Sequence, residues 1–514
     1  MGKGKCNMKK AMVKVVSAAV AGLLVLSGCS TSSKPASESQ NSQGSQQPVN
    51  IVYYNMSYGD KYTDLNAIQD KLNQYTKSKI NVTATIKEIE FSTYTQQVST
   101  MLASGEPVDL ISSWGQAGGI ANMVGQHQIM PLDNYIDKEG AGIKSSLGKL
   151  LGGLKVNGSI YAIPFNSSKL YSTSLHFNKA MVDKYKMDLS SIKTYKDLAK
   201  IFAVIKKNEP NITPFDFTNF YWPNYAIGGC IDQYDSLGDG IGVLTQNKDY
   251  KVVDLYETPQ YKDLVTTMHQ WYQAGYFNKD AATSNDMGYS SYMQGKTFCF
   301  VNVDTMDDFD KPYDDPHYTA TVPAYSLSLN KPIISNSVGF YCNSIPTTSP
   351  HPDAAMKWLN LMYTDPTAVN MLYYGIEGSD YVKNSDGTVQ DAPGVTAANK
   401  KWSTDLLWSF GNTDLMYRSK VISEDFNTKI RSMNKNATYS IAFGFNFDTS
   451  KVKNAYTAVN NVINQYRRPL ECGSVDPATK LPEFIQKLKN ANIDQIITEK
   501  QNQLNTWVTK YKDK

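Results

Sequence analysis

The chain has 514 residues, which is more than one small hydrophobic core needs and favours two or three domains. Its 51 Lys and Arg residues nearly balance 48 Asp and Glu residues, and the net charge of +3 argues against a nucleic-acid partner. After the N-terminal segment no run of 18 apolar residues occurs, so we expect nothing further to cross a membrane.

The N-terminus has the pattern of an export signal. Lysines among the first ten residues precede an apolar run over residues 18–26, which is too short to span a bilayer. The run ends in Leu26-Ser27-Gly28-Cys29, a lipobox. We therefore predict a signal peptide over residues 1–28 and lipidation of Cys29, which anchors the protein in the cell membrane facing outside the cytoplasm. The alternative is an ordinary secretory signal that contains a cysteine.

Residues 29–48 are rich in Ser and Gln and contain almost no apolar side chains, which predicts a flexible tether. Strand and helix patterns then alternate in the order β-α-β-α-β, which indicates a mostly parallel sheet with helices on its faces. The expected strands cover residues 49–54, 81–89 and 108–112, and the expected helices cover 62–78 and 94–103. Ligands bind at the carboxyl ends of such strands, where the loops 55–60, 90–93 and 113–118 would meet.

A turn and short strand over residues 158–164 lead into a second series of strand and helix patterns. This second series predicts another α/β lobe. Its expected elements are a strand at 172–178, a helix from Lys179, a helix at 193–207 with Thr194 as N-cap, a strand at 215–218, a helix at 260–274 and a strand at 297–303.

Beyond Gly394 the chain is expected to be mainly helical. A strand at 337–342 and a helix at 353–363 would return to the first lobe, and further helices are expected at 397–408, 423–434, 452–466, 481–490 and 493–511. The resulting domains are lobe 1 (49–172, with 343–440 returning to it), lobe 2 (173–342) and a helical region (441–514) that packs on the lobes. Two lobes joined by a hinge would place a ligand in the cleft between them.

The chain resembles extracellular solute-binding proteins of ABC importers, specifically the LipO-like lipoprotein branch. The general part of the resemblance is the lipobox, the segment 103–110 (ASGEPVDL) and the strand at 158–164. The part typical of the branch is C-terminal and comprises 374–378 (YGIEG), 443–448 (FGFNFD), 473–477 (GSVDP), 481–484 (LPEF) and 501–507 (QNQLNTW). The resemblance implies an α/β, two-lobed, periplasmic-binding-protein-like fold with a C-terminal helical extension. It further implies a protein that delivers a solute, most often an oligosaccharide, to membrane permease subunits, but it transfers no ligand contacts.

An oligosaccharide site needs aromatic platforms for the apolar faces of the sugar rings, and amides or carboxylates for the hydroxyl groups. Such residues should lie on loops at strand ends, or on the C-terminal segments that approach the cleft. The predicted ligand contacts are Trp114, Gln116, Phe165, Asn166, Asn219, Tyr221, Trp222, Tyr374, Glu377, Trp402 and Trp408. Trp271 and Trp358 lie within predicted helices and are expected in the core, whereas Trp507 is expected to pack the helical tail.

Motifs for catalysis and cofactors are missing from the sequence. There is no G-x-S-x-G and no H-E-x-x-H, and residues 295–297 indicate a helix-to-strand turn rather than a phosphate loop. Residues 238–242 lack dinucleotide-binding spacing and indicate a surface loop. We therefore expect a monomeric binding protein with no enzyme activity and no cofactor.

Three alternatives remain open. A tethered glycosidase needs two carboxylates about 5–10 Å apart, and folding could bring such a pair together. A receptor for a peptide or another non-sugar solute is the other functional alternative. The acidic segment 304–315 could bind calcium, although a solvated loop is favoured and no metal site is predicted.

Free buried thiols are favoured over disulfides for Cys230, Cys299, Cys342 and Cys472.

Overall fold

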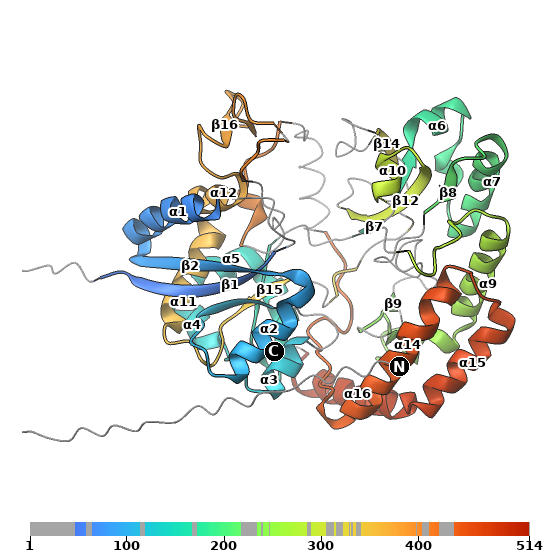
Figure 1. Cartoon of the computed structure of the whole chain (residues 1–514). Helices are drawn as coiled ribbons and strands as arrows, with labels where there is room; N and C mark the ends of the chain where they lie inside the picture. Colours follow the sequence, from blue (N-terminus) through green and yellow to red (C-terminus); the bar gives the residue numbers. More distant parts are fainter. Residues whose placement is uncertain are drawn as a thin grey trace, which may run out of the picture. The chain divides into compact units, whose positions relative to one another are not determined.

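The computed structural model (Figure 1) describes residues 47–57, 64–113, 119–166, 172–216, 234–237, 240–245, 247–284, 289–304, 313–314, 322–327, 329, 333–335, 341–396, 398–402, 411–420 and 436–512. Cys29 and most of the predicted tether lie outside these residues, as does most of the acidic segment.

A five-stranded sheet in the order β2-β1-β3-β15-β6 forms the centre of what we term the first assembly. Strand β1 (Val49–Ser57) pairs in parallel with β2 (Val82–Glu90) and with β3 (Leu110–Ser113). Strand β15 (Cys342–Ser344) runs antiparallel to β3 and to β6 (Ile163–Pro164). The predicted parallel core is confirmed. Strand β15 joins this sheet and overlaps the strand predicted at 337–342 at Cys342, whereas residues 337–340 lie outside the described residues.

Helices α1 (Leu65–Ile80), α2 (Phe91–Ala103) and α11 (Pro352–Thr364) contact this sheet (Figure 1). Helix α11 starts with a proline and has eight buried residues, and its Trp358 is fully buried with its ring centroid 5.7 Å from that of Tyr53. Trp358 is therefore a core residue, as predicted.

Shorter elements complete the first assembly. They are α3 (Gly119–Gly125), α4 (Asp133–Glu139), α5 (Ala141–Leu147), the 3-10 helix η2 (Gly148–Leu154), β4 (Lys155–Val156), β5 (Ser159–Ile160), α12 (Pro366–Tyr374), β16 (Tyr381–Lys383) and β17 (Val389–Asp391).

A second five-stranded sheet, in the order β13-β14-β7-β12-β8, forms the centre of the second assembly. Strand β7 (Ser172–Asn178) runs antiparallel to β12 (Thr297–Asp304) and to β14 (Ala324–Leu327). Strand β8 (Thr213–Phe215) is parallel to β12, and β13 (Tyr313–Asp314) borders β14. The predicted second α/β unit is thus present, with a sheet that is mainly antiparallel.

A small three-stranded sheet corrects one prediction. Strand β10 (Ile241–Leu244) lies between β9 (Tyr234–Asp235) and β11 (Val252–Asp254), so the end of the segment 238–242 is a buried strand rather than a surface loop. Gly242 is required there because a Cβ atom would lie 1.9 Å from the Asp235 carbonyl oxygen.

The helices of the second assembly are α6 (Lys179–Lys184), α7 (Leu198–Asn208), α9 (Pro259–Gln273) and α10 (Tyr289–Met293). Helix α7 begins later than predicted, because Thr194 opens a 3-10 turn first. The Thr194 amide donates to the Asp197 carboxylate (2.9 Å), and backbone bonds of this kind lower the pKa of Asp197. Gly295, with φ of +69°, lies in the short segment 294–296 between α10 and β12, which confirms the predicted helix-to-strand turn.

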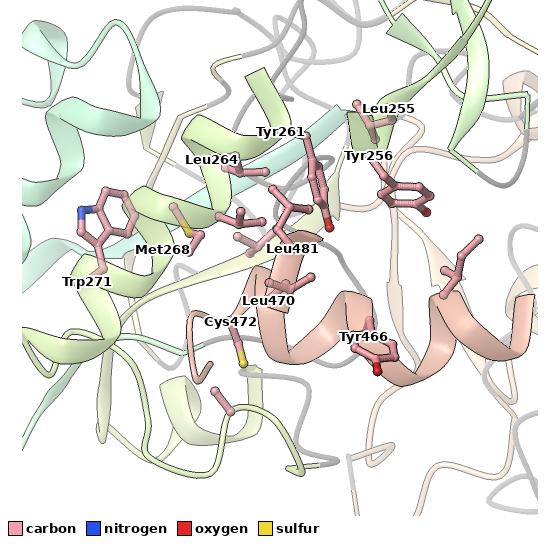
Figure 2. Close-up of a cluster of buried hydrophobic side chains, with 14 of the residues drawn as sticks. Leu255, Tyr256, Tyr261, Leu264, Met268, Trp271, Tyr466, Leu470, Cys472 and Leu481 are labelled. Atoms are coloured by element: carbon pink, nitrogen blue, oxygen red, sulfur yellow. The ribbon is translucent and has the colours of Figure 1, made fainter. Parts of the chain in front are cut away.

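Three C-terminal helices share one hydrophobic core with the second assembly (Figure 2). They are α14 (Lys453–Glu471), α15 (Pro477–Asn490) and α16 (Ile493–Lys510). Figure 2 shows Leu470 of α14 and Leu481 of α15 beside side chains of α9, and Tyr466 and Cys472 belong to the same core. Of the helix predicted at 397–408, residues 398–402 are not helical, and the helix predicted at 423–434 lies outside the described residues.

Buried side chains predicted from the sequence are found in these cores. Trp271 of α9 is buried as expected. Cys299, Cys342 and Cys472 are buried thiols that form no disulfide within the described part of the chain. Cys230 lies outside that part.

A buried carboxyl group joins α14 to α9. Glu471 is fully buried, accepts a hydrogen bond from the Tyr261 hydroxyl (3.1 Å) and lies 3.7 Å from Nε of Arg467. Burial raises the pKa of Glu471 to about 7, although the Arg467 charge lowers it in part. The folded protein therefore holds the Glu471 proton more tightly than the unfolded chain does.

We expect the free energy of unfolding to fall as pH rises from 5 to 8, because folded Glu471 must then ionise in an apolar setting. Glu471→Gln should remove this part of the pH dependence, since the amide stays neutral. The free energy of unfolding of Glu471→Gln should equal that of the parent at pH 5. At pH 8 it should be larger by about 1–3 kcal/mol. Urea denaturation at the two pH values measures both differences, and an equal difference at both would contradict the assignment.

Candidate functional site

The carboxyl edge of the first sheet gathers several strand ends. Strands β1, β2 and β3 are parallel and end at Ser57, Glu90 and Ser113. Strand β6 has the same direction because both β3 and β6 are antiparallel to β15, and it leads into Phe165 and Asn166. The ends of β3 and β6, and the predicted ligand residues Phe165 and Asn166 after β6, therefore belong to one edge of one sheet.

A buried polar network lies immediately behind this edge. Ser112 Oγ donates to Asn55 Oδ1 (2.6 Å), and the Tyr53 hydroxyl lies 3.0 Å from the same oxygen. Asn343 of β15 donates from Nδ2 to the Tyr53 hydroxyl (2.9 Å). Burial raises the pKa of Tyr53 well above its ordinary value, so its hydroxyl stays neutral and can donate. The network links the ends of three strands and thereby holds the edge in place.

Polar atoms at and behind this edge have no hydrogen-bond partner within the described part of the chain. They are Nδ2 of Asn55, Oγ of Ser113, Oδ1 of Asn166 and Oδ1 of Asn343. Buried polar groups are normally paired with protein, water or ligand. These atoms include both donors and acceptors, which suits a ligand or ordered water that carries hydroxyl groups.

Asn166 is the best-positioned of the predicted ligand residues that the structure describes. It is 2% exposed, and its Nδ2 donates to Asn412 Oδ1 (2.7 Å) and to Asp414 Oδ2 (3.2 Å). Its amide donates to the Gly411 carbonyl (2.8 Å), and its carbonyl accepts from the Thr413 amide (2.9 Å). Both the backbone and the side chain of Asn166 are therefore fixed, and its Oδ1 has one orientation.

Phe165 and Trp402 are placed mainly by packing. Phe165 is buried, with its ring centroid 6.2 Å from that of Tyr341. Trp402 is also buried, and its indole N–H donates to the Leu372 carbonyl (3.0 Å). Because this bond uses its only polar group, we leave Trp402 out of the site proposed below, although a ligand contact by this residue was predicted from the sequence.

Tyr374 and Glu377 lie beside the β16–β17 hairpin. The Tyr374 hydroxyl donates to the Tyr417 carbonyl (2.8 Å), and its ring centroid lies 5.7 Å from that of Tyr381. Glu377 is half exposed and forms an ion pair with Lys383 (3.0 Å). The backbone at Ile376 is bound by Asp380 rather than by Glu377, because the Asp380 carboxylate accepts from the Ile376 amide (2.7 Å).

The other predicted site residues lie outside the described residues. These are Cys29, Trp114, Gln116, Asn219, Tyr221, Trp222 and Trp408. Trp114 and Gln116 follow the end of β3 in the sequence, and Asn219, Tyr221 and Trp222 follow the end of β8. Their roles stay predictions.

Sequence reasoning missed Asn55, Ser113 and Asn343 as individual candidates. Asn55 carried a signal, because an amide is unusual in an apolar strand and its neighbours from Ile51 to Met56 are mostly apolar. The sequence around Asn343 gave no usable signal for the site, because its hydrogen-bond partner Tyr53 is 290 residues away in the chain.

Neither a metal centre nor a membrane helix is found in the residues that can be described. No group of three or more His, Cys, Asp or Glu side chains among them could hold a metal ion. Of the helices in these same ranges, none has the length and apolar character that crossing a bilayer requires.

Comparison with protein families gives two matches. Residues 59–369 match the family described as bacterial extracellular solute-binding proteins, which covers more than half of the chain. Residues 441–509 match a family described only as a domain of unknown function. The second match covers the C-terminal helices and the segment that leads into them.

Comparison with individual proteins agrees with the family match. A carbohydrate ABC transporter substrate-binding protein of Streptococcus pneumoniae serotype 4 is 27% identical over 501 residues, which are 95% of this chain and 96% of the relative. Lipoprotein LipO of Bacillus subtilis is 23% identical and covers 58% of this chain and 57% of LipO. The crystal structure of the N-glycan transport solute-binding protein NgtS of Streptococcus pneumoniae has a TM-score of 0.78 at 24% identity, covering 90% of this chain and 99% of NgtS.

Proposed function

Because the chain belongs to the family of bacterial extracellular solute-binding proteins, we propose that it captures an oligosaccharide and delivers it to an ABC importer. Its fold is the two-lobed α/β fold of that family with additional C-terminal helices. Like its relatives, it is a binding protein and not an enzyme, so the glycosidase alternative is set aside. The similarity to a carbohydrate transport protein over 95% of the chain carries the proposal.

The carboxyl edge of the first sheet supplies chemistry that fits a sugar. The fixed Oδ1 of Asn166 can accept a hydroxyl hydrogen, and Ser113 Oγ can donate or accept at the same edge. Trp114, next to Ser113 in the sequence, would supply the aromatic platform for a sugar ring. We therefore propose that the ligand occupies this edge, and that the predicted residues after β8 contact it from the other lobe.

The proposed ligand class is an oligosaccharide that contains mannose and N-acetylglucosamine. Structures of NgtS in complex with Man1GlcNAc and with Man5GlcNAc also align with 90% of this chain. The lipobox supports anchoring through Cys29, and the anchored protein would transfer the sugar to permease subunits in the same membrane.

Titration calorimetry of the mature protein with Man5GlcNAc tests the proposal. We expect binding by the parent protein and an affinity about tenfold lower for Asn166→Ala, because one well-oriented hydrogen bond is lost. Asn208→Ala is the matched control, since the Asn208 side chain donates to the Val204 carbonyl at the exposed end of α7. Binding of peptides in place of sugars would favour the non-sugar alternative, and unchanged affinity in Asn166→Ala would contradict the site.

A further inference from the structure

Residues 436–449 cross from one hydrophobic core to the other, and we term them the crossover segment. Tyr439 and Phe443 pack against the core of the first assembly. Ala442, Phe445 and Phe447 belong to the core that the second assembly shares with the C-terminal helices. The change of core thus takes place within a few residues, at the start of the region matched to the family without an assigned function.

Ile334, which follows β14 in the chain, is hydrogen-bonded to this segment. Leu327 belongs to the core of the second assembly, whereas Ile334 belongs to that of the first. The Ile334 amide donates to the Thr438 carbonyl (2.8 Å), and the Ser440 amide donates to the Ile334 carbonyl (2.8 Å). Ile334 is therefore paired with the crossover segment at Thr438 and Ser440.

Side chains of the crossover segment also bind the first assembly directly. Asn446 donates from Nδ2 to the carbonyls of Gly153 (3.2 Å) and Lys155 (2.9 Å). Thr449 donates from Oγ1 to Asn122 Oδ1 of α3 (2.8 Å). The approach is close, because a Cβ atom on Gly444 would lie 3.1 Å from the Gly152 carbonyl oxygen.

Helix α16 holds the same segment from the other side. Gln503 accepts from the Asp448 amide (2.9 Å) and donates to the Asp448 carbonyl (2.8 Å), so one side chain satisfies both backbone groups. Lys500 places its Nζ 4.9 Å from the Phe447 ring centroid and donates to the Ile241 carbonyl of β10 (2.9 Å). Helix α16 is thus fixed to the second assembly and carries the segment with it.

We propose that residues 441–509 form a hinge clamp, in which α16 fixes the crossover segment and the segment binds the first assembly through Asn446 and Thr449. The clamp restrains the relative motion of the two assemblies, because it joins α16 of the second to η2, β4 and α3 of the first. The proposal goes beyond the proposed function, since the clamp acts whatever solute the protein binds. It assigns a mechanical role to the C-terminal region, whose side-chain contacts described above are with η2, β4 and α3 rather than with the ligand edge.

Hydrogen exchange of the ligand-free protein tests the clamp. In Gln503→Ala the Asp448 amide loses its acceptor, so its exchange should accelerate about tenfold, and exchange in the peptide 148–158 should accelerate with it. Gln486→Ala is the matched control, because Gln486 donates to Asn490 on the exposed face of α15. Accelerated exchange confined to Asp448, with residues 148–158 unchanged, would overturn the proposal.

Asn446→Ala provides a second test from the opposite contact. It should accelerate exchange in residues 148–158 while the Asp448 amide, still bonded to Gln503, stays protected. Asn460→Ala, which removes a bond to the Tyr456 carbonyl within α14, should change neither. Unchanged exchange of residues 148–158 in Asn446→Ala would contradict the clamp, and these readouts need no ligand, so failure of the sugar proposal would not be mistaken for failure of the clamp.

Discussion

Trp358→Ala should lower the free energy of unfolding by about 3–5 kcal/mol, the usual cost of emptying a large aromatic site in a core. Trp358 is fully buried in α11, and its ring packs against Tyr53. Its indole N–H has no hydrogen-bond partner in the described residues, so the loss is one of packing. Urea denaturation followed by circular dichroism measures the effect, and a loss below about 1 kcal/mol would contradict the packing argument.

The same substitution should also disturb the ligand edge. Tyr53 holds Asn55, Ser112 and Asn343 together through its hydroxyl, and removal of Trp358 leaves the Tyr53 ring without its support. We expect faster amide exchange in β1 and β3. Trp271→Ala is the matched control, since Trp271 is also buried but packs in the core of the second assembly, and it should destabilise the protein without this local change.

Gly473→Ala should destabilise the protein by about 3 kcal/mol or more, because strain and a steric clash act together. Gly473 has φ of +72°, and a Cβ atom there would lie 2.2 Å from the Met268 carbonyl oxygen of α9. Helix α9 cannot move away easily, since the Gly473 carbonyl also lies 2.7 Å from Nδ1 of His269. The contact between α14 and α9 would therefore open.

Gly295→Ala separates the two causes. Gly295 has a similar φ of +69°, but a Cβ atom added there would meet no described atom within 4 Å. We expect it to cost only about 1–2 kcal/mol, the strain of a left-handed alanine. Equal losses of unfolding free energy for the two variants in urea denaturation would show that the close contact with α9 contributes nothing.

The sequence predicted β1, β2, β3, α1, α2 and α11 of the first assembly to within a few residues, but it did not predict the shorter helices α3, α4, α5 and α12. Apolar periodicity decides these elements, and it is visible in any short window, as in β1 and α11. The glycine-rich segment 238–242 was predicted to be a surface loop, but it ends in the buried strand β10. The pairing of β10 with two neighbours requires a glycine at a close backbone approach, and no local pattern reveals that approach.

The candidate site was predicted in outline only. Phe165 and Asn166 were chosen because they follow the end of a predicted strand, and the structure brings them to the same edge as Ser113. Trp402 was also predicted to contact the ligand, but its aromatic ring and indole N–H, which suit a sugar, are used in packing against α12. The two residues differ in whether a polar atom is left for a ligand: Asn166 has Oδ1 without a partner in the described residues, whereas the Trp402 indole N–H is already bonded.

By itself, the sequence determined the α/β class and the positions of most helices and strands, because each depends on residues close together in the chain. Only the tertiary structure decided which distant residues meet, such as Tyr53 with Asn343, Asn166 with Asn412 and Asn446 with Gly153. The physical reason is that a hydrogen bond between such residues depends on how sheets and helices pack. That packing is settled by burial over the whole chain, which leaves no local pattern in the sequence.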